Sequence, residues 1–475
     1  MARSGSIPKR LEVVPVKREK EVEEEEQEDE DADETEDKDQ AEDQDEDQDE
    51  GEEEGQDDDD EEEEDHREEE KDDQDMELEE QNDKQEGRQK EDKNVQPNED
   101  VLAQLLTDGV PLNHFGVVFS DPEDLKILMD SLGDPDTSAK PRPWDGIQSL
   151  GLAFTDDCRS DEPNVLESLL LHLPDTITSF ELRLTDSYAI SEDESDFLFH
   201  EPILHLPEHF AGRLTSFSIS CDWGAQHMFT LLEHCVNLEV VTLDFKVMEG
   251  LWTIEYTDYL QTGHLPRIKL PKLHTLCLRG VPPDVVDILW YLEAPALANL
   301  DFEFVDDGLF EDDGFDYALL AFLTTQSKCA ATLKSFRLAG PLKLNPKGLC
   351  IILDELPALT YLGLDNVSFN DGEDLFQALK ERCTGFSPGR IRRDPEPFLP
   401  SLRVLEIIGQ FEDDNFHHLS RFVTSREHTL RSQDDGRLKE LVVAYSKPPS
   451  PLDLDSWERK VLNKSATVVN IHPLR

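Results

Sequence analysis

Residues that could do chemistry are scattered along this chain of 475 residues. The sequence has no glycine-rich phosphate loop, no His-Glu-x-x-His zinc helix and no Gly-x-Ser-x-Gly nucleophile turn. His417 and His418 are its only adjacent histidines. Neighbouring residues on a helix point about 100° apart, so these two imidazoles are poorly placed to share a metal ion. We expect a surface pair here, and no metal site or cofactor elsewhere.

An acidic cluster, Asp306–Asp307 with Glu311–Asp313, has the ligand type for calcium. It lacks the twelve-residue spacing of a calcium loop that closes with Glu, so a solvated loop is the better interpretation. Carboxylates that meet only in the folded chain could still do acid–base chemistry, but the sequence singles out no such pair. We therefore expect no catalytic residue and no enzymatic activity.

Negative charge dominates the composition. The chain carries 110 Asp and Glu against 45 Lys and Arg, a net charge of −65, and the first hundred residues hold 50 acidic and 13 basic groups, which leaves −37 there. From Glu19 to Lys93 there is no aromatic residue and almost no aliphatic one, so this segment cannot bury enough apolar surface to offset its ordering entropy. We expect residues 1–100 to form a long disordered acidic tail.

This charge also bears on partners and location. An acidic tail repels nucleic acid, which binds clustered Lys and Arg, and it attracts basic proteins. No apolar run is long enough for a signal peptide or a membrane span, and the seven scattered cysteines favour reduced thiols. We expect an intracellular protein, cytoplasmic or nuclear, with no direct contact with nucleic acid or membrane. Lys9-Arg10 and Lys17-Arg18 with Lys20 match a two-part nuclear import signal, a pattern that is frequent by chance.

The elements that must position any binding residue follow from a repeated pattern. Ten times between Ile147 and Val443, an apolar residue is followed three and five positions later by two more. We call each set a triplet. Successive triplets start 24 to 43 residues apart, as in solenoid repeats, and their last two residues alternate with free positions, as in a strand. Apolar helix stripes follow several of them. The triplets start at Ile147, Ile177, Leu214, Leu238, Leu273, Leu297, Leu333, Leu359, Leu402 and Leu438, with an eleventh candidate at Leu112.

This arrangement resembles leucine-rich-repeat proteins, and its long, irregular repeats are most similar to those of fungal F-box proteins. The resemblance covers roughly Leu112 to Val443. It implies an α/β solenoid with a curved parallel sheet inside and helices outside. Two features depart from the family: residues such as Asp222 and Ser446 replace the usual Asn or Cys after a strand, and no F-box segment precedes the repeats. Repeats joined to an acidic run are also similar to the acidic leucine-rich nuclear phosphoproteins that bind histones, where the acidic segment follows the repeats.

We divide the chain into four parts. Residues 1–100 are the acidic tail, 101–145 an N-terminal cap or degenerate first repeat, 146–450 the solenoid and 451–475 a C-terminal cap. No single repeat can bury its own apolar stripe, so the stack needs a cover at each end. The N-terminal cover would contain a helix opened by Asp121-Pro122-Glu123, and the C-terminal cover would contain Trp457 and a strand at Val468–Ile471.

The strand positions that alternate with the triplets would form the concave face. Arg, Tyr and carboxylate side chains there could supply ion pairs and an aromatic anchor for a protein partner. The alternative is that every solenoid exposes a polar inner face, and that Arg279 merely pairs with Asp301 or Glu303 on the next strand. Thr242 and Cys277 also lie on this face. The predicted protein-binding residues are Asp244, Arg279, Asp301, Glu303, Arg337, Tyr361, Asp365 and Glu406.

A basic loop is the second candidate site, with Arg390, Arg392 and Arg393 inside the longest interval between triplets. It could fold back on the acidic tail, meet an acidic partner, or be an inert solvated insertion. Taken together, the sequence predicts a non-enzymatic scaffold or receptor that binds a protein of unknown identity on its concave face, with F-box-like substrate recognition as one form of that role. The alternative is a chaperone-like protein whose acidic tail binds histones or other basic proteins.

Overall fold

The structure is a computed structural model of the whole chain. It describes residues 10–13, 99–120, 122–133, 142–155, 165–184, 204–221, 225–246, 267–281, 286, 289–305, 314–369, 375–384, 398–409, 413–430, 438–445 and 466–473. All of these belong to one unit, made of residues 1–15 and 96–475.

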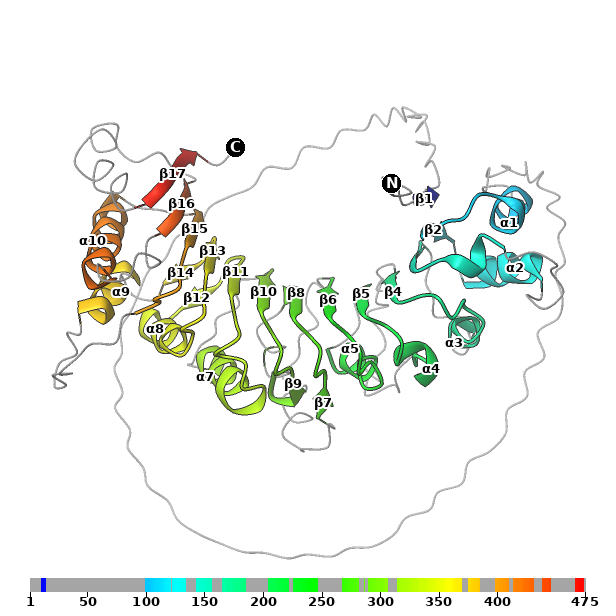
Figure 1. Ribbon diagram of the computed structural model, residues 1–475, viewed down its shortest axis with the longest axis horizontal. Coiled ribbons are helices and arrows are strands. Elements are labelled where there is room, and N and C mark those ends of the chain that lie inside the picture. Colours follow the sequence, from blue (N-terminus) through cyan, green and yellow to red (C-terminus); the bar gives the residue numbers. More distant parts are fainter. Residues whose placement is uncertain are drawn as a thin grey trace, which may run out of the picture. The chain divides into compact units, whose positions relative to one another are not determined.

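One parallel sheet of thirteen strands dominates this unit (Figure 1). The strands follow one another across the sheet in chain order, and each pairs in parallel with its neighbours. The fold is therefore α/β with a parallel sheet, as predicted. The strands are β1 (Arg10–Val13), β2 (His114–Phe119), β3 (Ser149–Phe154), β4 (Ser179–Arg183), β5 (Ser216–Cys221), β6 (Val240–Phe245), β8 (Thr275–Val281), β10 (Asn299–Phe304), β11 (Ser335–Ala339), β13 (Tyr361–Asp365), β15 (Val404–Gly409), β16 (Leu438–Tyr445) and β17 (Ala466–Pro473).

Helices occupy the connections, because parallel neighbours need a crossover between them. In Figure 1, α3, α4, α5, α7 and α8 lie on the same side of the row of strands. The helices are α1 (Glu99–Asp108), α2 (Pro122–Leu132), α3 (Val165–Leu170), α4 (Glu208–Ala211), α5 (Ala225–Thr230), α7 (Gly314–Ala321), α8 (Pro346–Asp354), α9 (Leu375–Thr384) and α10 (Asp413–Leu430). Two short strand pairs, β7 (Ile268–Lys269) with β9 (Leu292–Glu293) and β12 (Lys343–Leu344) with β14 (Ser368–Phe369), also lie in connections.

Several of these helices were predicted from apolar stripes. The stripe after Asp121 forms α2, and the stripes that include Leu375 and Phe416 lie in α9 and α10. The stripe that includes Leu349 lies in α8 except for its last residue, whereas the stripe that starts at Phe229 begins in α5 and continues into the turn after it. In the stripe after Pro282, residues 289–291 form a 3-10 turn. None of the helices that the structure describes has both the length and the apolar character needed to cross a membrane.

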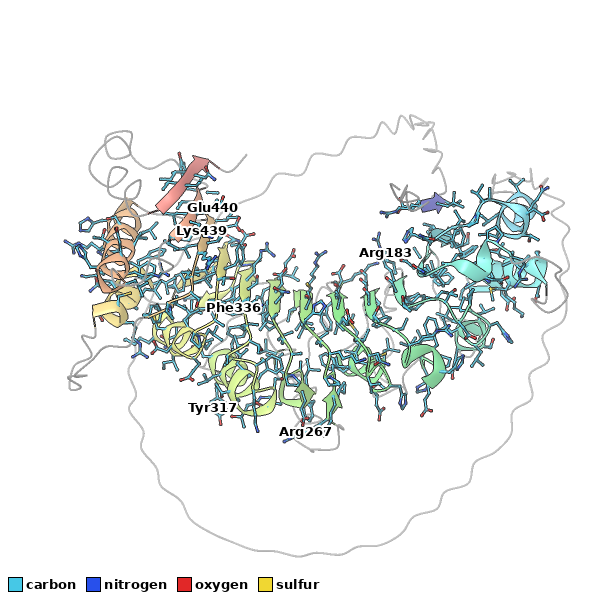
Figure 2. The ribbon with its side chains drawn as sticks, viewed as in Figure 1. Arg183, Arg267, Tyr317, Phe336, Lys439 and Glu440 are labelled. Atoms are coloured by element: carbon cyan, nitrogen blue, oxygen red, sulfur yellow. The ribbon has the colours of Figure 1, made fainter. Side chains whose placement is uncertain are left out.

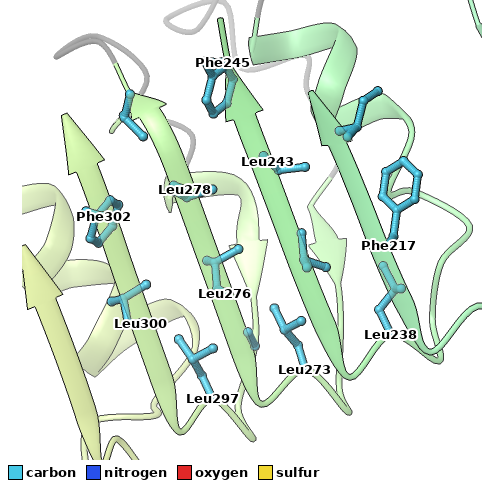
Figure 3. Close-up of a cluster of buried hydrophobic side chains, with 14 of the residues drawn as sticks. Phe217, Leu238, Leu243, Phe245, Leu273, Leu276, Leu278, Leu297, Leu300 and Phe302 are labelled. Carbon is cyan, nitrogen blue, oxygen red and sulfur yellow. The ribbon is translucent and has the colours of Figure 1, made fainter. Parts of the chain in front are cut away.

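The triplets form the core between the sheet and its helices. Every residue of the ten triplets is buried, and so are Leu112, Phe115 and Val117 of the eleventh candidate. Figure 3 shows how residues of successive strands line up in rows, such as Leu243, Leu278 and Phe302. Each fully buried side chain of this size stabilises the fold by about 1.5–3 kcal/mol, and a one-residue slip of a strand would turn its buried side chains outward.

Buried arginines satisfy backbone groups where the chain turns between strands. The Arg426 guanidinium donates to the carbonyl oxygens of Leu399 and Leu402, and burial lowers its pKa to about 10. Arg142 likewise donates to the carbonyl oxygens of Leu132 and Gly133 at the end of α2. These bonds matter because a buried carbonyl without a partner would cost roughly 1–3 kcal/mol.

Both edges of the sheet are covered by strands that lie outside the triplets. At one edge β17 pairs with β16, which confirms the strand predicted at Val468–Ile471. Trp457 lies outside the described residues. At the other edge β1 pairs with β2, and Leu11 and Val13 pack against the core.

The strand β1 corrects the prediction that residues 1–100 form one disordered tail, because residues 10–13 are part of the sheet. Residues 16–95, between β1 and α1, belong to a second unit. The acidic run that begins at Glu19 lies in this second unit and outside the described residues.

Candidate functional site

The candidate site lies on the side of the sheet that the helices leave uncovered. We call it the open face; it consists of the strand positions that alternate with the buried triplet positions. In Figure 2, Arg183 projects from β4 away from the helices, whereas Tyr317 projects outward from α7. All eight predicted binding residues lie on the open face, on strands β6, β8, β10, β11, β13 and β15, which are adjacent in the sheet.

Arg337 is the centre of a polar network on this face. Its Nη1 lies 3.1 Å from Oδ1 of Asp301 on β10, and its Nη2 lies 2.9 Å from Oδ2 of Asp365 on β13. Asp301 is the direct register partner of Arg337, whereas Asp365 lies two positions further along its strand. Burial alone would lower the pKa of the Arg337 guanidinium, but the two carboxylates raise it above its ordinary value. The guanidinium is therefore fixed across three strands.

Tyr361 forms the second part of the network. Its hydroxyl donates a hydrogen bond to Oε2 of Glu406 on β15. The register partner of Glu406 is Gly363, so the Tyr361 side chain must extend along its own strand to reach the carboxylate. A Cβ atom on Gly363 would stand only 2.8 Å from the Tyr361 Oη, and glycine therefore makes this arrangement possible. Burial, followed by the bond to Glu406, raises the pKa of Tyr361, which keeps the hydroxyl protonated as a donor.

Arg279 does not form the ion pair that was considered for it. In the structure, Arg337 rather than Arg279 binds Asp301, and Arg279 is exposed without a hydrogen bond or ion pair to the described residues. Asp301 is the register partner of Cys277, two positions before Arg279, and β8 bulges where Arg279 would lie opposite Glu303. Gly280 has a φ of +62°, a Cβ there would lie 2.0 Å from the carbonyl oxygen of Phe245, and the register with β10 shifts between Phe302 and Phe304.

The two remaining predicted residues differ in their contacts. Asp244 accepts a hydrogen bond of 3.0 Å from the hydroxyl of Ser220. Glu303 is exposed, and its carboxylate has no hydrogen bond or ion pair within the part of the chain that the structure describes. It is therefore the most accessible carboxylate of the eight-residue set.

Cys277 lies in the same region, in register with Thr242 and Asp301. It is partly exposed, whereas the other five described cysteines are buried. Burial raises the pKa of the Cys277 thiol, and the nearby Asp301 raises it further. The thiol is thus poorly suited to act as a nucleophile. Among the described residues, no three Cys, His, Asp or Glu side chains are placed to hold a metal ion.

The open face is acidic from β6 to β16. On these strands its charged side chains are six carboxylates and two guanidinium groups, an excess of four negative charges. The carboxylates belong to Asp244, Asp301, Glu303, Asp365, Glu406 and Glu440, and the guanidinium groups to Arg279 and Arg337.

The other sequence candidates lie either outside the described residues or in α10. Arg390, Arg392 and Arg393 of the basic loop lie outside the described residues, as does the acidic cluster at 306–313. His417 and His418 lie in α10, with ring centroids 5.7 Å apart. Sequence reasoning missed Ser220 and Gly363. The signal for Gly363 was available, because a lone glycine inside a strand often marks a close approach of other atoms.

A scan of the chain against protein-family models found no match, and a search of curated proteins found none either.

Proposed function

We propose that this chain is a leucine-rich-repeat solenoid that acts as a non-enzymatic scaffold or receptor and binds a protein partner on its open face, which would be the concave side. Recognition of a substrate in the manner of F-box proteins is one form of this role. The order of the strands supports a solenoid, because each strand pairs only with its neighbours in the repeat. The constant alignment of the triplets supports it as well.

A single observation supports binding on this face: the network of Asp301, Arg337 and Asp365, next to Tyr361 and Glu406, is held by four adjacent strands. Side chains fixed before binding lose little conformational entropy when a partner docks. Tyr and Arg are also the residue types that most often dominate the free energy of protein–protein binding. The network is partly exposed, so a partner can reach it.

The same groups argue against catalysis as the role of this face. A nucleophile needs a lowered pKa or an adjacent base that takes its proton. The pKa values of Tyr361 and Cys277 are both raised, so both stay protonated near neutral pH. The network is better suited to hold a partner than to attack a substrate.

Affinity purification from cells would test this proposal with two matched tyrosines. Tyr361→Ala changes the open face, and Tyr317→Ala changes an exposed tyrosine on the helix side of the sheet, which is 66% exposed. We expect partner capture to be lost with Tyr361→Ala and kept with Tyr317→Ala, while thermal unfolding shows that both variants are folded. Loss with Tyr317→Ala alone, or capture by both variants, would reject the open face as the binding site.

The acidic run supports a second candidate, binding of histones or other basic proteins. Its observation is the net charge of −37 in the first hundred residues. The test is to replace the Asp and Glu residues from 19 to 93 by Asn and Gln. Replacement is preferable to deletion, because β1 and α1 are connected through this segment. Loss of core-histone binding by this variant, whose open-face residues are unaltered, would favour this candidate. Retention of core-histone binding would exclude it.

A further inference from the structure

We infer that the partner segment seated on the open face is basic: an extended stretch of polypeptide whose Lys or Arg side chains lie over the carboxylates between β6 and β16. This inference rests on the proposed function and specifies the chemistry of the partner. Three features of the open face support it: its excess of negative charge, its excess of hydrogen-bond acceptors over donors, and the lack of excess charge on the neighbouring strands.

The charge of this surface favours a cation. The excess of four negative charges on the open-face positions remains after Arg337, which is shared by Asp301 and Asp365, has been counted. Partly buried charges on a sheet are screened less than fully exposed ones, so they both attract and orient a basic segment. An acidic peptide or a nucleic acid would be repelled. A second copy of this chain, with its own net charge of −65, is also a poor occupant.

The hydrogen-bonding groups make the same distinction. Arg337 already donates to two carboxylates and Tyr361 to a third, so their donors are used within the protein. Each of these carboxylates has a second oxygen that accepts no hydrogen bond from the described residues, and Glu303 has two. The surface thus offers many acceptors and few donors. Lys supplies three donors and Arg five, with no acceptor, which is the complementary set.

The neighbouring strands limit the surface on which the basic segment can bind. On β4 and β5 the open face carries serines and one adjacent ion pair, Glu181 with Arg183, which has no excess charge. A basic segment therefore gains nothing electrostatically by extending past β6 toward β2. We expect its cations to lie over β8 to β15, close to Glu303.

Cys277 offers a local reporter for the test, because it lies on this surface and the other described cysteines are buried. Cys158 lies outside the described residues, so the experiment uses the full-length protein with Cys158→Ser. It follows alkylation of Cys277 by iodoacetamide at mildly alkaline pH. The probes are oligoarginine, oligolysine and oligoglutamate peptides. A reporter on the sheet distinguishes binding there from binding to the acidic run.

We expect oligoarginine and oligolysine to protect Cys277 and oligoglutamate to have no effect, with protection falling as salt is added. Glu303→Lys should raise the half-protecting peptide concentration about tenfold, as expected for the loss of a close charge pair. The matched change Glu233→Lys, in the turn after α5, should leave it unchanged.

Absence of protection by the basic peptides, equal protection by oligoglutamate, or an equal effect of Glu233→Lys would overturn the inference. The proposed function is judged separately. If Tyr361→Ala still abolishes capture of a cellular partner, the open face binds a protein that is not basic. If the basic peptides give no protection and Tyr361→Ala still captures the cellular partner, the proposed function fails as well.

Discussion

The open face differs between the two halves of the sheet, although their buried sides are alike. On β2 and β3, Gly116 and Gly151 lie in register between the pairs His114–Ser149 and Val118–Ala153, and the Cβ of a residue at 151 would meet nothing closer than 3.7 Å. From β10 to β15 the same face carries the network around Arg337, and the equivalent glycine, Gly363, is covered by Tyr361.

This difference shows that the buried positions of the repeat are kept alike in both halves while the open-face positions vary. The buried triplets use Leu, Ile, Phe and Val in both halves and bury them equally well. The alternating positions on the open face do not contribute to that core, so their side chains can change without changing the fold. One half of the open face therefore carries an excess of negative charge and a network that spans strands, whereas the charges of the other half pair within their own strands, as Glu181 and Arg183 do on β4.

The largest effect on stability should come from the buried side of the sheet, which is alike in both halves. Leu150→Asp on β3 and Leu362→Asp on β13 each place a charge at a position that is 0–1% exposed. Both should lower the free energy of unfolding by at least about 3–5 kcal/mol, because a buried charge has no partner there. Chemical denaturation measures this, and Cys277→Ser is the control that should leave stability nearly unchanged. A mild effect in one half only would mean that the cores are not equivalent.

Replacing one open-face glycine in each half should change stability in opposite directions. Gly363→Ala places a methyl group against the Tyr361 ring, so we expect the Tyr361–Glu406 bond to break and stability to fall by about 1–2 kcal/mol. Gly151→Ala has room and should stabilise the protein by about 0.4–1 kcal/mol, because it restricts the unfolded chain. Thermal unfolding of both variants tests this. Tyrosine titration should show a lowered pKa for Tyr361 in Gly363→Ala alone.

Replacing an open-face arginine in each half should have a smaller effect. Arg337→Met leaves Asp301 and Asp365 without their shared cation, and we expect a loss of roughly 1 kcal/mol that shrinks at high salt. Arg183 is 66% exposed and pairs only with Glu181 on its own strand, so Arg183→Met should change the stability by almost nothing. Denaturation at low and high salt compares the two. Equal losses would mean that the Arg337 network adds no more than a surface ion pair.

The smallest effect should be a dependence on pH of the docking of β1, at the edge of the first half of the sheet. Burial, and then Arg10, lower the pKa of His114 from 6.5, although Glu12 and Glu181 oppose this shift. Because docked β1 favours neutral His114, the stability of docking should decrease as the pH falls through about 6.5 and His114 takes up a proton. Hydrogen exchange of residues 10–13 measures this. In His114→Gln the protection should not depend on pH in that range, and an equal decrease there would exclude His114 as the cause.

Much of the fold could be predicted from the sequence. The triplets identified strands such as β6, β8 and β10, their buried residues and the alternation that puts Asp301, Arg337 and Tyr361 on one face. The strand β1 was not predicted, because four residues beside a long acidic run carry too little periodicity. The contacts within the network were not predicted either, since side chains reach diagonally across strands as well as directly.

The sequence by itself therefore determined the repeat, the parallel strands and the division of their residues into buried and open positions. It could do so because burial in a strand follows a local period of two. Tertiary structure alone decided that Arg337, and not Arg279, joins Asp301, and that Gly363 lets Tyr361 reach Glu406. These contacts depend on the register between strands, which is set by packing between residues far apart in the chain.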